Sequence, residues 1–317
     1  MDSFNKIDYR LRPAKHAERL MMMELFRHLR FGPVSEYQYV GFGSVAFIDM
    51  KMAHRHLGIH DLVSIEGTRD LVAQQRFEHN KPYNGIDLRF GHSSTVLPQV
   101  DFGRRSIVWL DYDGSISRSI ANDLEGVARR ASSGTFLGVT ITTMFPLPVE
   151  TDAREKELAR LKGDFPEFLG DDQKASAFDG GKYAEFARTA LGSLIARAVA
   201  DADSAKLPGA RRAVHQICNF RYKDGAPMVT FGWIIVKADE RDMLEKSRFE
   251  SLSFFRAHKE HFRIQVPLVT PMEVREMERR LPALADCTDL DWIPEEYRTE
   301  FQRIYRYLPH FGVLEPV

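Results

Sequence analysis

The segment "SIVWLDYDG", residues 106–114, carries the residues whose types and spacing best suit chemistry. Asp111 and Asp113 flank Tyr112 directly after an apolar run, and Gly114 permits an unusual backbone beyond them. Two carboxylates at the end of a strand can orient a ligand amine, accept a proton from a nucleophile or hold a metal. The structural alternative is a turn in which the aspartates cap the next helix.

A glycine turn follows an earlier apolar run in "YQYVGFGSVAF". Gly41 and Gly43 let the backbone bend sharply and approach a ligand without an intervening Cβ. The amides that open the next helical segment, from Ser44 onward, can accept an anionic group such as a carboxylate. Glu66 ends the following predicted strand about 20 residues later, where an acid typically accepts hydrogen bonds from ribose hydroxyls. The alternative is a simple glycine turn with a solvated Glu66.

A third polar site follows the next strand, in "RFGHSSTVLP". His92 and Ser93 come just past the strand end, where their polar side chains could contact a purine edge. A surface loop histidine is the alternative for His92.

The elements that must position these residues alternate between strands and helices. Strand, helix, strand repeated in this way predicts a parallel sheet with helices on both faces. The carboxyl ends of parallel strands meet at one edge, and ligands bind there where the strand order reverses. The predicted strands are "EYQYVGF", "DLVSIEG", "GIDLRFGH", "SIVWLDYDG" and "GTFLGVTITTMF".

The chain divides into a core with two additions. Residues 1–35 form an N-terminal helical segment, with Pro13 in the first turn of its helix. Residues 36–238 form the main domain, with a helical insert at about 150–210 and a closing hairpin around Lys223-Asp224-Gly225. Residues 239–317 form a helical tail that we expect to pack on this domain.

Composition limits the class of protein. The 317 residues are 44% hydrophobic and carry a net charge of −1, so no global basic field draws the chain to nucleic acid. Cys218 and Cys287 are too few for a disulfide framework, which fits a reducing compartment. No apolar run approaches the ~20 residues of a membrane helix, and the N-terminus lacks a secretory pattern. We therefore predict a cytoplasmic protein with no membrane partner.

The order of these motifs resembles that of class I S-adenosylmethionine-dependent methyltransferases. More narrowly, "RLRPAKHAER", "YQYVGFGSVAF", "SIEG" and "VWLDYDG" resemble a bacterial family of O-methyltransferases of unknown substrate. The resemblance implies a doubly wound, Rossmann-like α/β fold. Its mostly parallel seven-stranded sheet would end in an antiparallel hairpin, with helical N- and C-terminal additions.

The resemblance also implies S-adenosylmethionine as cofactor and assigns residues to it. Glu66 would hold the ribose hydroxyls, His92 and Ser93 the adenine, and Asp111 the methionine amine or the substrate. We expect Asp111 or Asp113 to act as base and Tyr112 to shape the pocket. The full expected cofactor site is Gly41, Phe42, Gly43, Ser44, Glu66, His92, Ser93 and Asp111.

Two departures bear on this resemblance. The family pattern opens with an acid two residues before the first glycine, where this chain has Tyr39, and Val45 replaces its third glycine. A second hypothesis is therefore a catalytically inactive, cofactor-binding module that regulates or binds a partner. A nicotinamide-dependent dehydrogenase is disfavoured because the third glycine of its motif is replaced by Ala46 and the chain has a terminal hairpin.

The methyl acceptor is left open by the sequence, as is the oligomeric state. A small molecule, a protein or a nucleic acid could accept the methyl group on oxygen or nitrogen, and a homo-oligomer or a partner protein is compatible with the sequence. No metal site is predicted, because His56 and His60 share a helix face without the glutamate of a zinc protease motif.

Two charged segments allow two interpretations each. The cluster of Arg10, Arg12, Lys15, His16 and Arg19 could receive an acidic substrate, but a solvated set of helix-flanking charges is favoured. The tail interleaves basic and aromatic residues that could stack bases. Aromatics such as Phe301, Tyr305 and Tyr307 are more simply explained as a docking face.

Overall fold

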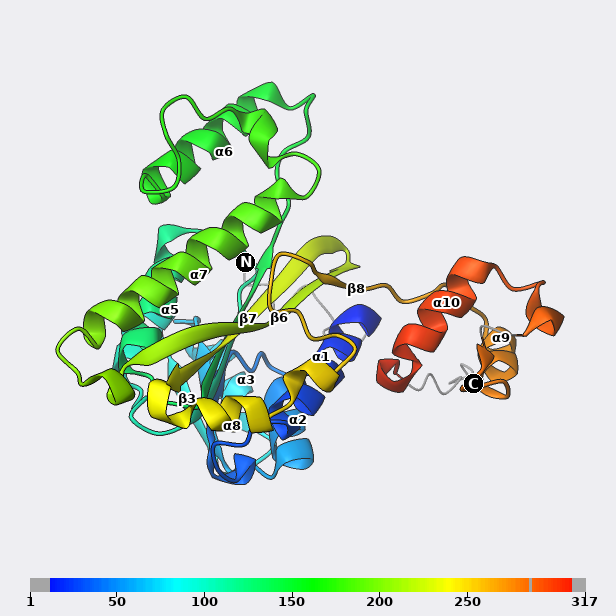
Figure 1. The fold of residues 1–317 in the computed structure, drawn as a ribbon, viewed down its shortest axis with the longest axis horizontal. Helices are drawn as coiled ribbons and strands as arrows, with labels where there is room; N and C mark the ends of the chain where they lie inside the picture. The colour runs from blue at the N-terminus through cyan, green and yellow to red at the C-terminus, as the bar shows by residue number, and fades with distance from the viewer. Residues whose placement is uncertain (1–11, 285–286, 310–317) are drawn as a thin grey trace.

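A central sheet organises the molecule in a computed structural model that describes residues 12–284 and 287–309 (Figure 1). Its strand order is β3-β2-β1-β4-β5-β7-β6-β8, so the order reverses between β1 and β4. The strands are β1 Gln38–Gly41, β2 Asp61–Glu66, β3 Ile86–Phe90, β4 Ser106–Asp111, β5 Thr135–Thr142, β6 Arg212–Asp224, β7 Ala226–Lys237 and β8 Phe262–Ile264.

The strand directions confirm the predicted fold class. β1 to β5 pair in parallel, and β7 runs antiparallel to both β5 and β6, which forms the expected hairpin. The eighth strand, β8, was not predicted and adds to the expected seven. It pairs with β6 in parallel over three residues, a run too short to show a strand pattern in the sequence.

Helices cover both faces of the sheet. Buried residues of α1 and α2 pack on the face that carries Tyr39 and Trp109, whereas α5 and α7 pack on the face that carries Val40 and Val108. The helices are α1 Pro13–Arg27, α2 Ile48–Leu57, α3 Leu71–Asn80, α4 Ser93–Val96, α5 Arg118–Arg130, α6 Thr151–Asp164, α7 Lys182–Ala202, α8 Arg241–Lys246, α9 Pro271–Glu278 and α10 Glu295–Ile304.

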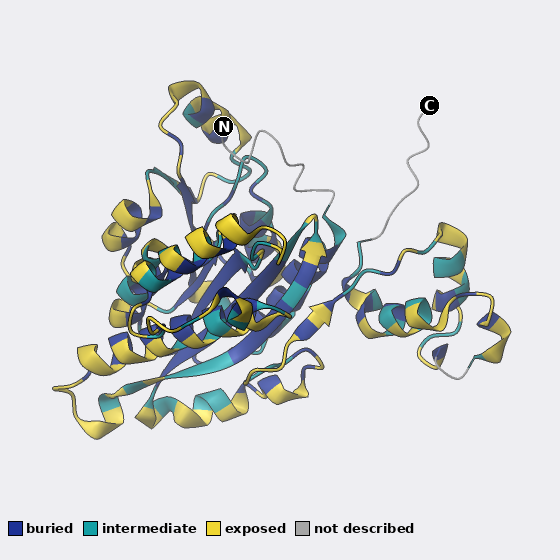
Figure 2. Ribbon diagram, turned by 90° about the horizontal axis from the view of Figure 1, so that it is seen from above, coloured by how far each residue is buried: buried dark blue, intermediate teal, exposed yellow. Residues whose placement is uncertain are grey.

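Burial follows this layering. Figure 2 shows the strands buried between helices whose outer faces are exposed. Ile107 and Val108 of β4 are both fully buried although their side chains point to opposite faces. This explains why the sequence of β4 is apolar throughout rather than alternating, as strands covered on both faces are.

The position of α1 is fixed by a residue far away in the sequence. Arg12, at its N-cap, makes no side-chain capping bond. The carboxylate of Asp224, at the tip of the β6–β7 hairpin, instead accepts hydrogen bonds from the amides of Ala14 at 3.2 Å and Lys15 at 2.8 Å. These are amides of the first helical turn that lack intrahelical partners, so the hairpin supplies the cap of α1.

The chain after β8 builds a small apolar cluster of its own, joined to the main body by residues 265–270 (Figure 1). Phe301 is buried in that cluster, and Tyr307 packs edge-on against Phe254 of the main body. Tyr307 thus contacts the main body, as the docking interpretation expects, whereas Phe301 and the Tyr305 ring stacked on it belong to the tail's own cluster. Within residues 12–284 and 287–309, no helix combines the length and apolarity that crossing a bilayer requires.

Candidate functional site

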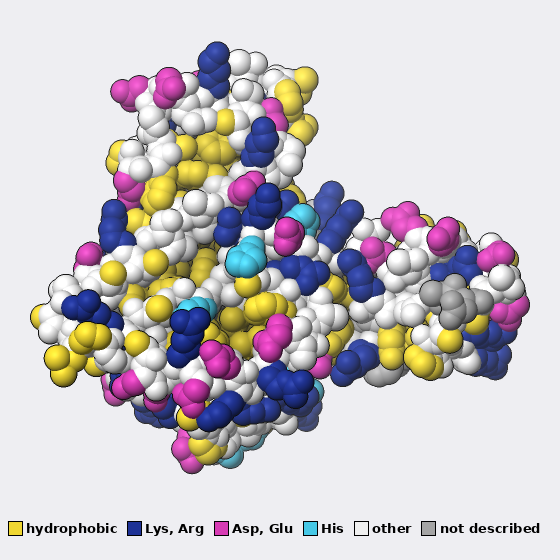
Figure 3. All heavy atoms as spheres, in the orientation of Figure 1, with side chains coloured by type: hydrophobic (Ala, Val, Ile, Leu, Met, Phe, Trp, Pro, Cys, Tyr) yellow, Lys and Arg dark blue, Asp and Glu magenta, His cyan; other side chains and the backbone are white. Residues whose placement is uncertain are grey.

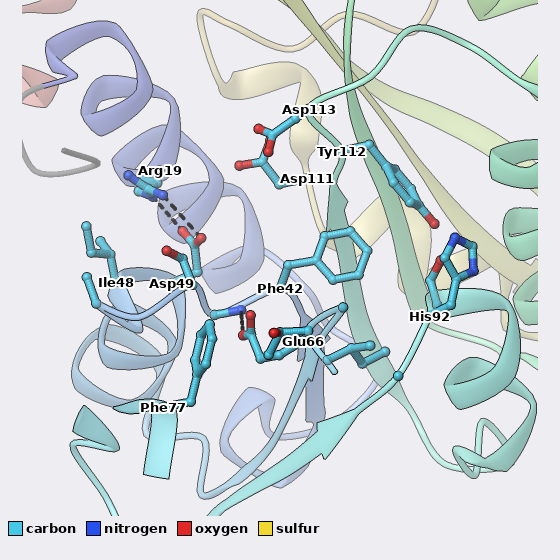
Figure 4. A pocket seen from close by; sticks show the side chains of 18 residues that line it. Arg19, Phe42, Ile48, Asp49, Glu66, Phe77, His92, Asp111, Tyr112 and Asp113 are labelled. Carbon is cyan, nitrogen blue, oxygen red and sulfur yellow. Dashed lines mark hydrogen bonds and ion pairs between the residues drawn. The ribbon is translucent and has the colours of Figure 1, made fainter. Parts of the chain in front are cut away.

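A cavity of about 330 Å³ lies at the carboxyl edge of the sheet, next to the reversal of strand order between β1 and β4 (Figure 4). Its size suits a small-molecule ligand. Every predicted site residue except Gly41 lines it. The predicted residues in the lining are Phe42, Gly43, Ser44, Glu66, His92, Ser93, Asp111, Tyr112 and Asp113.

The glycine turn and Glu66 form one hydrogen-bonded unit at the base of this cavity. The amide of Gly43 donates to Glu66 Oε1 at 2.9 Å and to Ser64 Oγ at 3.1 Å, and the Ser64 hydroxyl also donates to Glu66 Oε1 at 2.8 Å. A Cβ at Gly43 would lie 2.4 Å from Ser64 Oγ and 2.7 Å from Phe47 Cδ1. Glycine is therefore required there by the protein's own packing.

Burial sets the protonation behaviour of Glu66. Its side chain is only 6% exposed, so the interpretation of Glu66 as a solvated residue is wrong. Burial raises the pKa of Glu66 to about 7, against the hydrogen bonds from Ser64, Gly43 and Ser44, which lower it. The carboxyl group can thus change charge near neutral pH, while its Oε1 atom is held in place.

Gly41 has a structural role that the spacing did not reveal. A Cβ at this position would lie 2.7 Å from the carbonyl oxygen of Trp109 on the neighbouring strand β4. Gly41 is not part of the cavity lining, so its contact with a cofactor stays a prediction.

Ser93 and Tyr112 meet at a residue that the sequence analysis missed. Both hydroxyls donate to Asp123 Oδ2, at 2.5 Å from Ser93 Oγ and at 2.7 Å from the Tyr112 oxygen. Asp123 is buried on α5, and the signal in the sequence was its place on the same helix face as the apolar Ile120 and Val127. Burial and the nearby Asp123 carboxylate raise the pKa of Tyr112, so this hydroxyl stays protonated.

His92 occupies the N-cap of the short helix α4. Its Nδ1 atom accepts a hydrogen bond from the Ser94 amide at 3.2 Å and lies 2.7 Å from Ser94 Oγ. In Figure 4, His92 and the ring of Tyr112 form one side of the cavity, opposite Arg19 and Asp49. The ring of Phe42 packs edge-on against Tyr112, with centroids 5.0 Å apart.

Asp111 and Asp113 point to the same side of the cavity. β4 ends at Asp111, and strand alternation places Asp111 on the same face as Trp109, beneath α1. Figure 4 shows the carboxylates of Asp111 and Asp113 close together on the side away from His92. Asp113 is exposed and makes no hydrogen bond or ion pair with any residue that the structure describes.

Lys15 of α1 fixes Asp111 from above the sheet. Its Nζ atom is 2.9 Å from Asp111 Oδ2 and 2.8 Å from Glu18 Oε2, and it lies 4.6 Å from the centroid of the Trp109 ring. The side chains of Lys15 and Glu18 are fully buried. Burial lowers the pKa of Lys15, but the attraction of Asp111 and Glu18 outweighs it and raises the pKa above its ordinary value.

Arg19 lies one turn further along α1 and lines the cavity. Its Nε atom donates to Asp49 Oδ1 at 2.6 Å and its terminal nitrogen to Asp49 Oδ2 at 3.3 Å, a bidentate pair. Arg19 is 4% and Asp49 7% exposed. Burial opposes the charge of Arg19, but Asp49 more than compensates and raises the pKa of the guanidinium.

The favoured interpretation of the N-terminal charges as a solvated set is therefore wrong for Lys15 and Arg19. A signal was present in the sequence: Lys15, Glu18 and Arg19 share a helix face with the apolar Met22 and Phe26. Charges on an apolar face are expected to be buried and paired. Arg10, from the same cluster, lies outside the described residues.

The described part of the chain contains no group of three or more His, Cys, Asp and Glu side chains positioned to hold a metal ion. The expectation that His56 and His60 share a helix face is wrong, because α2 ends at Leu57 and His60 lies beyond it. His56 Nδ1 lies 3.2 Å from a terminal nitrogen of the Arg27 guanidinium.

Comparison with known proteins identifies the family. A family model described as "Putative O-methyltransferase" matches residues 7–316. The chain belongs to this family, and thus to the methyltransferase class of proteins. No curated protein matches it.

Solved structures similar to this chain include proteins with bound cofactors. Cofactor-bound Rv0187 from MTB is 13% identical, with 73% of this chain and 84% of that chain covered and a TM-score of 0.37. A structure described as "a putative O-methyltransferase from Klebsiella pneumoniae" is 10% identical, with 72% of this chain and 81% of that chain covered and a TM-score of 0.36. LepI in complex with SAH and a substrate analogue is 8% identical, with 67% and 46% covered and a TM-score of 0.39. The chain thus spans less than half of the length of LepI.

Proposed function

We propose that this protein transfers a methyl group from S-adenosylmethionine to an oxygen or nitrogen atom of an acceptor. The observation that carries the proposal is the meeting of the Gly43–Glu66 unit, the Ser93–Tyr112 pair and Asp111 around one cavity at the switch point of the sheet. Ligands of doubly wound sheets bind at this position.

The polar groups of the cavity fit the parts of this cofactor in turn. Glu66 would accept hydrogen bonds from the ribose hydroxyls, because Gly43 and Ser64 hold its Oε1 atom in place and its side chain lines the cavity. His92 and Ser93 would contact the adenine. Arg19 would attract the methionine carboxylate, and Asp111 would attract the amino group.

Asp111 and Asp113 would then have different roles, one in binding and one in proton uptake. S-Adenosylmethionine supplies an activated methyl group on a sulfonium, so the protein must orient the acceptor and take up its proton. Lys15, which is itself paired with Glu18, holds Asp111 in one position, which suits a binding role. Asp113 is exposed beside it and has no partner among the described residues, so its carboxylate is the better placed to accept the proton.

The alternative of an inactive module is less well supported. Membership of an O-methyltransferase family favours an enzyme. Asp113 also gives the cavity a carboxylate that no structural bond occupies within the described residues.

Cofactor binding can be tested by calorimetry with S-adenosylmethionine, its demethylated product and NAD. We expect the first two to bind and NAD not to bind. Glu66→Ala should weaken S-adenosylmethionine binding at least tenfold, about 1.4 kcal/mol, because the ribose hydroxyls lose their acceptor. Glu155→Ala, which removes an exposed acid of α6, is the matched control and should bind normally. An unchanged dissociation constant for Glu66→Ala would remove Glu66 from the site.

The catalytic assignment can be tested with labelled S-adenosylmethionine and fractionated cell extract as the source of acceptor. Asp113→Asn should lower the rate of methyl transfer by about 10²–10⁴-fold with little change in cofactor affinity, as expected for loss of a general base. Asp111→Asn should weaken cofactor binding instead. If Asp111→Asn lost turnover and Asp113→Asn lost cofactor affinity, Asp111 would be the base and Asp113 the binding residue.

A further inference from the structure

A second groove lies at the same edge of the sheet, on the far side of the first turn of α1. It is formed where β6 and β8 end, has a volume of about 580 Å³, and is rich in cations. Lys, Arg and His side chains gather over the ends of these strands in Figure 3. The basic residues in its lining are Arg221, Lys223, His261 and Arg263.

Two of these arginines are direct neighbours in the sheet. Arg221 of β6 is the register partner of Arg263 of β8, and Lys223 follows Arg221 by two residues on the same face. Their strand neighbours Phe220 and Phe262 are buried on the opposite face, toward α1. Like charges placed side by side on a sheet destabilise it, so this arrangement calls for another explanation than folding stability.

The protein does not neutralise these charges itself. None of Arg221, Lys223, His261 and Arg263 forms an ion pair with a residue in the described ranges. Asp224, the acid in the groove lining, already accepts the amides of Ala14 and Lys15. Glu185 attracts Arg221 electrostatically but forms no ion pair with it.

The local electrostatics agree with this geometry. Burial lowers the pKa of His261, and the charges of Arg221, Arg263 and Arg256 lower it further. Burial also lowers the pKa of Arg221, whose side chain is half-buried beside Gly181. The groove therefore carries positive charge, and a bound anion would reduce the repulsion among its cations.

The groove adjoins the methyl-transfer cavity through consecutive residues. Ala14 lines the groove, whereas the next residue, Lys15, holds Asp111 of the cavity. A molecule anchored in the groove thus lies beside the helix turn that positions the reactive end of the site.

We propose that this groove binds a phosphate group of the methyl acceptor, so that the substrate is a phosphate-bearing molecule. This inference rests on the function proposed above. A phosphate offers three strong acceptor oxygens, which match the fork-shaped donors of Arg221 and Arg263 together with the ammonium of Lys223. A carboxylate, with two oxygens, leaves one of these donors without an acceptor.

The proposal can be tested by thermal unfolding with inorganic phosphate, with acetate and with a short single-stranded oligonucleotide, all at one ionic strength. Phosphate should raise the midpoint of the wild-type protein and should bind at least tenfold more weakly to Arg221→Gln/Arg263→Gln. The unliganded double variant should be at least as stable as the wild type, because the repulsion is gone. The matched control Arg55→Gln/Arg275→Gln removes two exposed arginines and should respond to phosphate normally.

Several outcomes would overturn the proposal: no response of the wild type to phosphate, an equal response of the double variant, or acetate acting as strongly as phosphate. Oligonucleotide binding that the double variant loses would support a nucleic-acid phosphate. A response to free phosphate alone would support a small phosphate ester. S-Adenosylmethionine binding is measured on the same proteins and should be unchanged in the double variant. A failure of cofactor binding in the wild type would therefore count against the proposed function and not against the groove.

Discussion

The two sides of the cavity are built in different ways. On the β1–β2 side, Glu66 is held by hydrogen bonds from the Gly43 amide and the Ser64 hydroxyl, and all three residues lie within two adjacent strands and one turn. On the α1 side, Asp111 is held by Lys15, and Arg19 pairs with Asp49. Here the groups form ion pairs, are largely buried and are brought together from separate elements.

The difference shows two ways of presenting a carboxylate to a ligand. Glu66 is fixed by neutral donors, so burial dominates and its pKa rises to about 7. Asp111 is fixed by a buried ammonium, and removal of that partner would leave an uncompensated charge. We expect the α1 side to respond strongly to mutation and the β1–β2 side to respond strongly to pH.

The largest effect is expected from Lys15→Met, which keeps the length of the side chain but removes its charge. Asp111 and Glu18 would then face each other without a cation, so the free energy of unfolding in urea should fall by about 3–5 kcal/mol. Adding Glu18→Gln should recover part of this loss, because one of the two unpaired acids is removed. Lys174→Met, at an exposed position on the insert, is the control and should be neutral. A loss below about 1 kcal/mol for Lys15→Met would contradict the charged network.

A smaller effect is expected from Glu66→Gln, and it should depend on pH. The pKa of Glu66 is about 7 in the folded protein against an ordinary value of 4.5, so the unfolded chain releases its proton first as pH rises. The wild type should therefore lose stability between pH 4.5 and 7 and remain level above that window, whereas the variant lacks this slope. At pH 8 the variant should be the more stable by up to about 3 kcal/mol. Urea unfolding at several pH values checks this, and parallel curves would show that Glu66 keeps an ordinary pKa.

The smallest effect is expected from Tyr112→Phe, on the wall shared by β4 and α5. The variant loses the hydroxyl bond to Asp123, while Ser93 continues to donate to the same carboxylate oxygen. The free energy of unfolding should fall by about 1 kcal/mol, and methyl transfer should continue, because Tyr112 shapes the pocket and carries no proton in the reaction. A loss of turnover comparable to that of Asp113→Asn would assign Tyr112 a chemical role.

The sequence by itself determined the order of strands and helices, the hairpin, the glycine turn and the position of Glu66. These features follow from local rules: the periodicity of apolar residues, the conformations open to glycine, and the shared edge of parallel strands. Since all five parallel strands end at one edge, residues as far apart as Gly43 and Asp113 could be placed together before any contact was known.

Only the tertiary structure decided which charges are buried and what they contact. Lys15 and Asp111, Ser93 and Asp123, and the Asp224 cap of α1 join residues from about thirty to over two hundred positions apart. The apolar face of α1 could indicate that Lys15 is buried and paired, but no local pattern names its partner, because Asp111 lies on a distant strand. The strand β8 and the pairing of Arg221 with Arg263 were hidden for the same reason, since three residues acquire a strand conformation only when β6 is beside them.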